Sequence, residues 1–247
     1  MTELKNIENL PVEVQKKYIP FLRKFLELYP SPISTVAVYG SAVTPHYIPG
    51  RSDINSVIIT LDTGFTNLNP VLKLIVSGVK QKISAPLLLT KAYIQSSLDS
   101  FPIEFLDIKE NHVSIYGEDF FTPLDITDQN LRLFCEHQIK GKLIRIRQSY
   151  MENGLNARAV EMLLKESLNA LIPVFKNIWR LKSGMIVVDK AKILAEISKE
   201  FNLDAEVFLA IYNYRTQNQK MSLQVAQNFM EKYFRQIEKL AEAVDQL

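Results

Sequence analysis

The chain has 247 residues, and 47% of them are hydrophobic, which is enough to fill the core of one large domain or two ordinary ones. Its 29 Lys and Arg residues nearly balance its 27 Asp and Glu residues, so the overall charge argues against a nucleic-acid partner or an anionic membrane surface. Cys135 is the single cysteine, no apolar segment approaches membrane-spanning length, and the N-terminus lacks a signal-peptide pattern. We expect a cytoplasmic protein without a membrane partner.

The first half of the chain alternates short β-rich runs with helical patterns. Apolar periodicity predicts a helix over residues 11–29 and a crossover helix over 71–79. Runs of apolar and β-branched residues predict strands, with the segment HVSIYG as a candidate for a further one. The predicted strands cover residues 33–39, 54–61, 86–90 and 103–108.

The pattern changes near Asp125, after which almost every segment has helical periodicity. Thr127 and Asp128 are candidates for the cap of the first helix beyond this change. We therefore predict an α+β protein with two domains: a mixed sheet flanked by helices over residues 1–122, and an all-helical bundle over residues 123–247.

A polar connection between two predicted strands carries the candidate site, in the stretch VAVYGSAVTPHYIPGRSDINSVIITLD at residues 36–62. Gly40 permits a tight turn and a close backbone approach, and Ser41 can offer its hydroxyl and backbone N–H groups to a phosphate. Because side chains alternate along a strand, Asp53 and Asn55 face the same side, as two ligands of one metal ion would.

A third acidic residue, Glu104, lies between apolar neighbours in the segment FPIEFLDI. On the predicted strand over 103–108, Asp107 would point to the opposite face from Glu104 and could not replace it.

These residues resemble the pattern of the nucleotidyltransferase superfamily, which includes the small bacterial relatives of kanamycin nucleotidyltransferase and the polymerase-beta fold. The pattern is an apolar strand ending in Gly-Ser, a gap of eleven residues, an Asp-x-acid pair on the next strand and a later acid among apolar residues. The resemblance covers about the first 120 residues, and the helical remainder is similar to the C-terminal helical domain of those transferases.

The resemblance implies a nucleoside triphosphate as substrate and two Mg²⁺ ions as cofactors. Gly40 and Ser41 would bind the nucleotide, Asp53 and Glu104 would be catalytic, and Asp53, Asn55 and Glu104 would hold the metal. An acceptor hydroxyl would attack the α-phosphorus, and pyrophosphate would leave.

Asn55 departs from the family pattern, because an active member would have a carboxylate there. An amide oxygen can ligate Mg²⁺ but adds no negative charge, and a unit charge at 4 Å contributes roughly 4 kcal/mol at an effective dielectric constant near 20. We therefore expect a weakened or altered metal site.

Two classes of function stay open. The protein either transfers a nucleoside monophosphate to a hydroxyl of a small molecule or a protein, or it is an inactive nucleotide-binding or partner-binding protein, and either form can be a homodimer. The basic residues of the segment KGKLIRIR form either a solvated or interface face, which we favour, or a triphosphate clamp. They are Lys140, Lys142, Arg145 and Arg147.

Overall fold

The computed structural model describes residues 3–45, 47–187, 189–217 and 220–247. The chain divides into two compact units, residues 1–126 and 127–247. The boundary predicted from the sequence lay between residues 122 and 123. Among the described residues, no helix is both long enough and apolar enough to cross a membrane.

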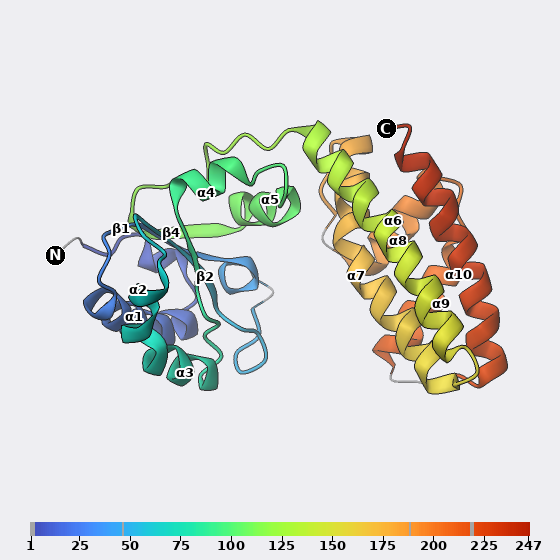
Figure 1. Ribbon diagram of the computed structural model, residues 1–247, viewed down its shortest axis with the longest axis horizontal. Coiled ribbons are helices and arrows are strands. Elements are labelled where there is room, and N and C mark those ends of the chain that lie inside the picture. The colour runs from blue at the N-terminus through green and yellow to red at the C-terminus, as the bar shows by residue number, and fades with distance from the viewer. Residues whose placement is uncertain (1–2, 46, 188, 218–219) are drawn as a thin grey trace. The chain divides into compact units, whose positions relative to one another are not determined.

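The N-terminal unit contains a sheet with helices on both faces (Figure 1). The two strands that border the candidate site agree with the sequence to within a residue or two, because their apolar runs are bounded by clear turn residues. The elements in chain order are η1 (Ile7–Asn9), α1 (Val12–Leu28), β1 (Ile33–Tyr39), η2 (Gly40–Val43), β2 (Asn55–Thr60), α2 (Phe65–Leu68), η3 (Asn69–Val71), α3 (Leu72–Lys80), β3 (Leu87–Leu89), α4 (Lys91–Ser96), α5 (Pro102–Glu110) and β4 (His112–Gly117).

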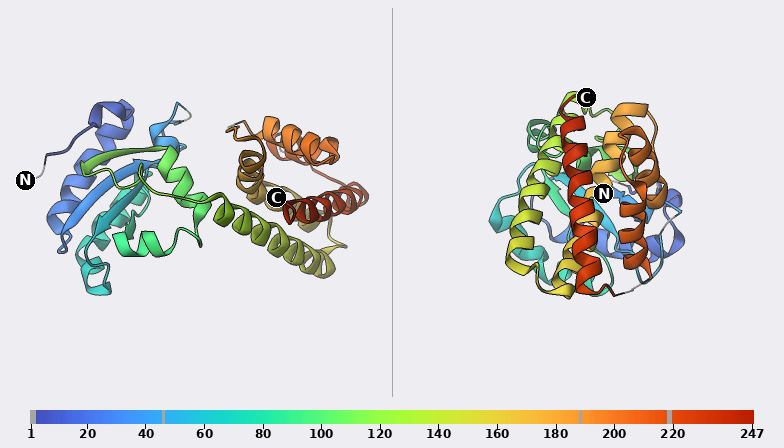
Figure 2. Two further views of the ribbon diagram at one scale, coloured as in Figure 1. Left: turned by 90° about the horizontal axis from the view of Figure 1, so that it is seen from above. Right: turned by 90° about the vertical axis from the view of Figure 1, so that its right-hand side faces the viewer.

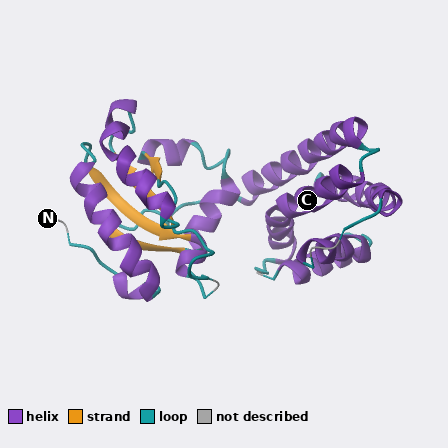
Figure 3. Ribbon diagram, turned by 90° about the horizontal axis from the view of Figure 1, so that it is seen from below, coloured by secondary structure: helices purple, strands orange, loops and turns teal. Residues whose placement is uncertain are grey.

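The sheet is mixed, with the strand order β3-β2-β1-β4. Strand β1 pairs antiparallel with both β2 and β4, whereas β2 pairs parallel with β3. A parallel pair needs a crossover connection, and α2, η3 and α3 supply it here. Figure 3 shows the strands in orange between the helices.

Alternating side chains of the strands feed two separate apolar cores. Val36, Val38 and Ile58 pack with α1 and α3 on one face. Ala37 and Val57 pack with residues of α4 and α5 on the other face. Because alternate residues point to opposite faces, both faces of the sheet are covered and only the strand ends remain for a site.

The strand predicted over residues 103–108 is wrong, because this segment forms helix α5. Pro102, Phe105 and Ile108 are buried at intervals of three residues, which is a helical spacing, and Pro102 occupies the start of the helix, where proline is favoured. The alternation from Ile103 to Phe105 resembled a strand only over three residues. The fourth strand is instead β4, the segment HVSIYG.

The C-terminal unit consists of helices in its described residues (Figure 2). Its long helix α7 contacts each of the other four, so α7 lies at the centre of the apolar core. The Thr127 side chain accepts a hydrogen bond from the Asn130 N–H, which confirms it as the cap of α6. The helices are α6 (Asp128–Asn153), α7 (Ala157–Ser183), α8 (Lys190–Glu200), α9 (Ala205–Thr216) and α10 (Leu223–Val244).

Candidate functional site

The Gly-Ser turn follows directly from the end of β1. Gly40 has φ +74°, a conformation that side chains rarely adopt, and its N–H donates to the Asn111 carbonyl at 2.9 Å. The N–H of Thr44 donates to the Ser41 carbonyl at 3.1 Å, which closes the short helix η2. The Gly40 N–H is therefore used within the protein and is not the donor that a phosphate would meet at this turn.

Asn55 lies against this turn. It is the first residue of β2 and pairs in register with Tyr39, the last residue of β1. A Cβ atom added to Gly40 would lie 3.9 Å from Asn55 Nδ2. The structure therefore brings Gly40 and Asn55 together, as the sequence spacing requires.

Asp53 lies just before β2, and 54% of its side chain is exposed. Its Oδ1 atom is 3.6 Å from Nζ of Lys82, a residue that the sequence analysis did not select. A surface ion pair of this kind contributes less than about 1 kcal/mol to stability. Its importance here is chemical, because the carboxylate expected to bind a metal ion already has a cation beside it.

Glu104 lies in the first turn of α5 and is exposed. Helix α5 covers the sheet face that carries Val57. Asn55 lies two residues before Val57 on β2, so the two residues face the same side of the sheet, which is the side of α5. The role of Glu104 as a metal ligand stays a prediction, although its segment forms helix α5 and not the strand on which that prediction rested. In the part of the chain that the structure describes, no three Asp, Glu, His or Cys side chains gather as a metal site.

Asp53 and Asn55 by themselves do not fit the two-ion magnesium site that the resemblance noted in the sequence implies. Two Mg²⁺ ions require several carboxylate oxygens in near-octahedral geometry. Asp53 is paired with Lys82, and residue 55 contributes a neutral amide.

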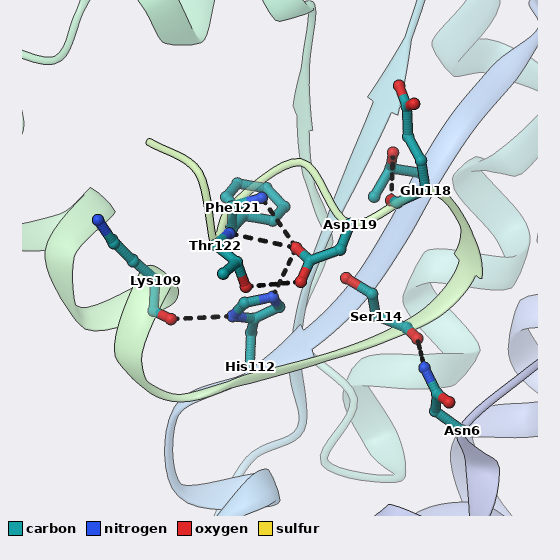
Figure 4. A network of polar contacts seen from close by, with 9 residues as sticks. Asn6, Lys109, His112, Ser114, Glu118, Asp119, Phe121 and Thr122 are labelled. Carbon is teal, nitrogen blue, oxygen red and sulfur yellow. Dashed lines mark hydrogen bonds and ion pairs between the residues drawn. The ribbon is translucent and has the colours of Figure 1, made fainter. Parts of the chain in front are cut away.

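A polar network beside the site was missed by the sequence analysis (Figure 4). His112 is the first residue of β4 and pairs in register with Tyr39, so it lies one strand away from the turn. Its Nε2 is 3.0 Å from Asp119 Oδ1, and its Nδ1 is 3.2 Å from the Lys109 carbonyl oxygen. Only 6% of the His112 side chain is exposed. The sole sequence signal was a histidine at the start of an apolar strand.

Asp119 is the acceptor at the centre of this network. It accepts hydrogen bonds from the N–H groups of Phe121 and Thr122 and from the Thr122 hydroxyl. Burial by itself raises the pKa of Asp119, but the hydrogen bonds from Thr122 and His112 outweigh it and lower the pKa to about 2. The network therefore holds an ionised carboxylate and fixes the segment after β4 to the strand end next to Gly40.

Two of the basic residues considered as a triphosphate clamp make ion pairs within the C-terminal unit. Lys140 Nζ lies 2.6 Å from Glu136 Oε1 and 3.3 Å from Asp245 Oδ1. Arg147 pairs with Glu238, and its guanidinium carbon is 4.7 Å from the ring centroid of Phe234. These contacts favour the interpretation of this segment as a solvated or interface face.

Comparison with known proteins finds a likeness in fold and none in sequence. No protein-family model matches the sequence, and a search of curated proteins finds no match. The fold is similar to that of spectinomycin adenyltransferase AAD(9) from Enterococcus faecialis, solved with ATP and spectinomycin. The TM-score is 0.55, the identity is 11%, and the match covers 92% of this chain and 98% of that one.

At this level of identity the likeness concerns the fold. The chain has a nucleotidyltransferase-like fold, with a mixed four-stranded sheet and flanking helices followed by a helical region. The fold class expected from the sequence is confirmed.

Proposed function

We propose that the protein binds a nucleoside triphosphate at the Gly40–Ser41 turn and transfers its nucleoside monophosphate slowly to a hydroxyl group. The proposal is supported chiefly by the position of the turn, which lies against Asn55 at the end of a sheet whose fold resembles an ATP-bound adenyltransferase. ATP is therefore the first nucleotide to test. The acceptor would be a small molecule or a protein side chain.

Transfer would follow the chemistry common to this reaction class. The acceptor oxygen would form a bond to the α-phosphorus, the bond from the α-phosphorus to the bridging oxygen would break, and pyrophosphate would leave. Asp53 and Glu104 are the carboxylates assigned to this step, and Glu104 would accept the proton that the acceptor hydroxyl loses. The rate is expected to be low because charge that develops on the phosphate oxygens needs preorganised positive charge, and a carboxylate-poor site recruits metal ions weakly.

A non-catalytic function is the second candidate, in which the protein binds a nucleotide or a partner without chemistry. The specific observation in its favour is the pairing of Asp53 with Lys82, beside a neutral amide at position 55. A protein of this kind would use the turn for recognition only.

One experiment separates the two candidates. Purified protein is incubated with labelled ATP, Mg²⁺ and a metabolite extract, and ATP binding and pyrophosphate release are measured for the parent, Ser41→Ala and Asp53→Ala. Ser100→Ala, at an exposed serine elsewhere in the same unit, is the matched control.

Pyrophosphate release that disappears in Asp53→Ala supports transfer. Binding that weakens in Ser41→Ala without any pyrophosphate release supports the non-catalytic candidate. If the parent binds no nucleoside triphosphate under any of these conditions, nucleotide binding at the turn is wrong.

A further inference from the structure

Lys82 has a backbone conformation that is unusual for its residue type. Its φ is +68°, in the left-handed region, where a side chain with a Cβ atom is strained and where Gly or Asn is more common. A lysine at such a position gives up some stability compared with glycine. This conformation ends helix α3 in a Schellman motif, in which the Ile83 N–H donates to the Gly78 carbonyl at 2.9 Å, so the helix end fixes the point from which the lysine side chain extends.

The surrounding structure fixes this backbone beside Asp53. The Lys82 N–H donates to the Val79 carbonyl at 3.1 Å, and its own carbonyl accepts from the Ile54 N–H at 2.7 Å. The next residue, Ile83, is only 1% exposed and forms a parallel bridge with Ile54. The position of Lys82 next to the start of β2 is therefore determined by the packing of the sheet and not by its side chain.

The Lys82 ammonium lies beside Asp53, the carboxylate that the family resemblance implies as a metal ligand. Nζ is 3.6 Å from Asp53 Oδ1, and about half of each side chain is exposed, so both can be reached from solvent. The neutral amide of Asn55 and the pairing of Asp53 with Lys82 leave this position without the carboxylates that two Mg²⁺ ions would need. A lysine ammonium, in contrast, is a common ligand of phosphate oxygens.

We propose that Lys82 supplies the positive charge of this site, so that the triphosphate of the nucleotide binds the Lys82 ammonium without a divalent metal ion. Asp53 acts as a positioning residue that holds the ammonium at the strand end. This inference rests on the proposed nucleotide binding and adds the group that recognises the phosphates.

The test measures ATP binding by isothermal calorimetry in EDTA and in Mg²⁺. Lys82→Gly removes the charge and relieves the backbone strain, so it should fold at least as well as the parent. Lys82→Arg keeps the charge. Lys80→Ala, at an exposed lysine at the end of α3, is the matched control for a general loss of positive charge.

The parent is expected to bind ATP in EDTA with a Kd within about threefold of that in Mg²⁺, and Lys82→Gly should weaken binding in EDTA by about tenfold or more. Lys82→Arg and Lys80→Ala should each stay within about threefold of the parent. An Asp53→Ala variant should show a smaller loss than Lys82→Gly, because it leaves the ammonium in place.

Two results would overturn the proposal while leaving nucleotide binding intact. These are ATP binding by the parent that depends on Mg²⁺, and unchanged binding by Lys82→Gly in EDTA. A parent that binds ATP in neither solution contradicts the proposed function itself, and this inference with it.

Discussion

Two glycines next to opposite ends of strand β1, Gly40 at the start of η2 and Gly117 at the end of β4, have similar backbone conformations but different surroundings. Gly40 at one end has φ +74°, and Gly117, paired with Thr35 near the other end, has φ +70°. A Cβ atom added to Gly117 would lie 1.8 Å from the Ser34 carbonyl oxygen, whereas one added to Gly40 would meet only Asn55 Nδ2, at 3.9 Å. The backbone of Ser34 occupies the space beside Gly117, whereas an added Cβ atom at Gly40 would make only an ordinary van der Waals contact.

The largest effect is expected for Gly117→Ala. Because the new Cβ atom would overlap a backbone carbonyl, strands β1 and β4 must separate, and we expect a loss of more than about 3 kcal/mol in the free energy of unfolding. Chemical denaturation followed by circular dichroism measures it. Gly40→Ala has the same backbone strain without the overlap, so an equal loss in the two variants would show that the comparison of the two ends is wrong.

Gly40→Ala should affect the site more than the fold. The strain at positive φ costs about 1 kcal/mol of stability, and the added methyl group would lie beside the proposed nucleotide position, so ATP binding should weaken by about tenfold. Gly50→Ala is the matched control, because Gly50 has φ +78° and no atom within 4 Å of an added Cβ. Similar losses of ATP binding in both variants would contradict the placement of the nucleotide at Gly40.

Asn55→Asp should create a response to metal. The change adds one negative charge beside Asp53 at nearly constant size, so the variant should be less stable than the parent without metal because the like charges repel. Addition of Mg²⁺ and ATP should then raise its Tm by more than it raises that of the parent. A parent with a large metal-dependent shift that Asn55→Asp leaves unchanged would show that Asn55 is an adequate ligand.

The smallest effect is expected for Asp119→Asn in the network that supports the turn. The pKa of Asp119 is lowered to about 2 from an ordinary value of 3.8, so its contribution to stability is present above pH 4 and is lost as the pH falls toward 2. Because 40% of the side chain is exposed, solvent screening limits this contribution to about 1 kcal/mol.

Denaturation of the parent and Asp119→Asn at pH 7, 4 and 2.5 tests this interpretation. The difference between the two proteins should shrink as the pH falls. A difference that stays constant with pH would show that the carboxylate charge contributes nothing, and that the variant acts only through its hydrogen-bond geometry.

The sequence by itself determined the parts of the fold that depend on local patterns. Strand β1 and the Gly40–Ser41 turn follow from an apolar run and a turn residue, and Asn55 lies opposite Tyr39 because the two strands are joined by one connection. The change to helical periodicity near Asp125 was likewise visible, because each helix carries its own apolar stripe.

Only the tertiary structure decided which charges meet at the strand ends. Residues 103–108 were misassigned because three alternating residues fit both a strand and a helix, and packing against the sheet selects the helix. Lys82 lies beside Asp53 because the crossover through α3 returns the chain to the edge of β2, and Asp119 reaches His112 because the chain turns back after β4. No local pattern encodes the pair of Lys82 and Asp53, since it depends on the path of the chain between two distant residues. His112 and Asp119 are seven residues apart, and their contact depends on the turn that the chain makes after β4.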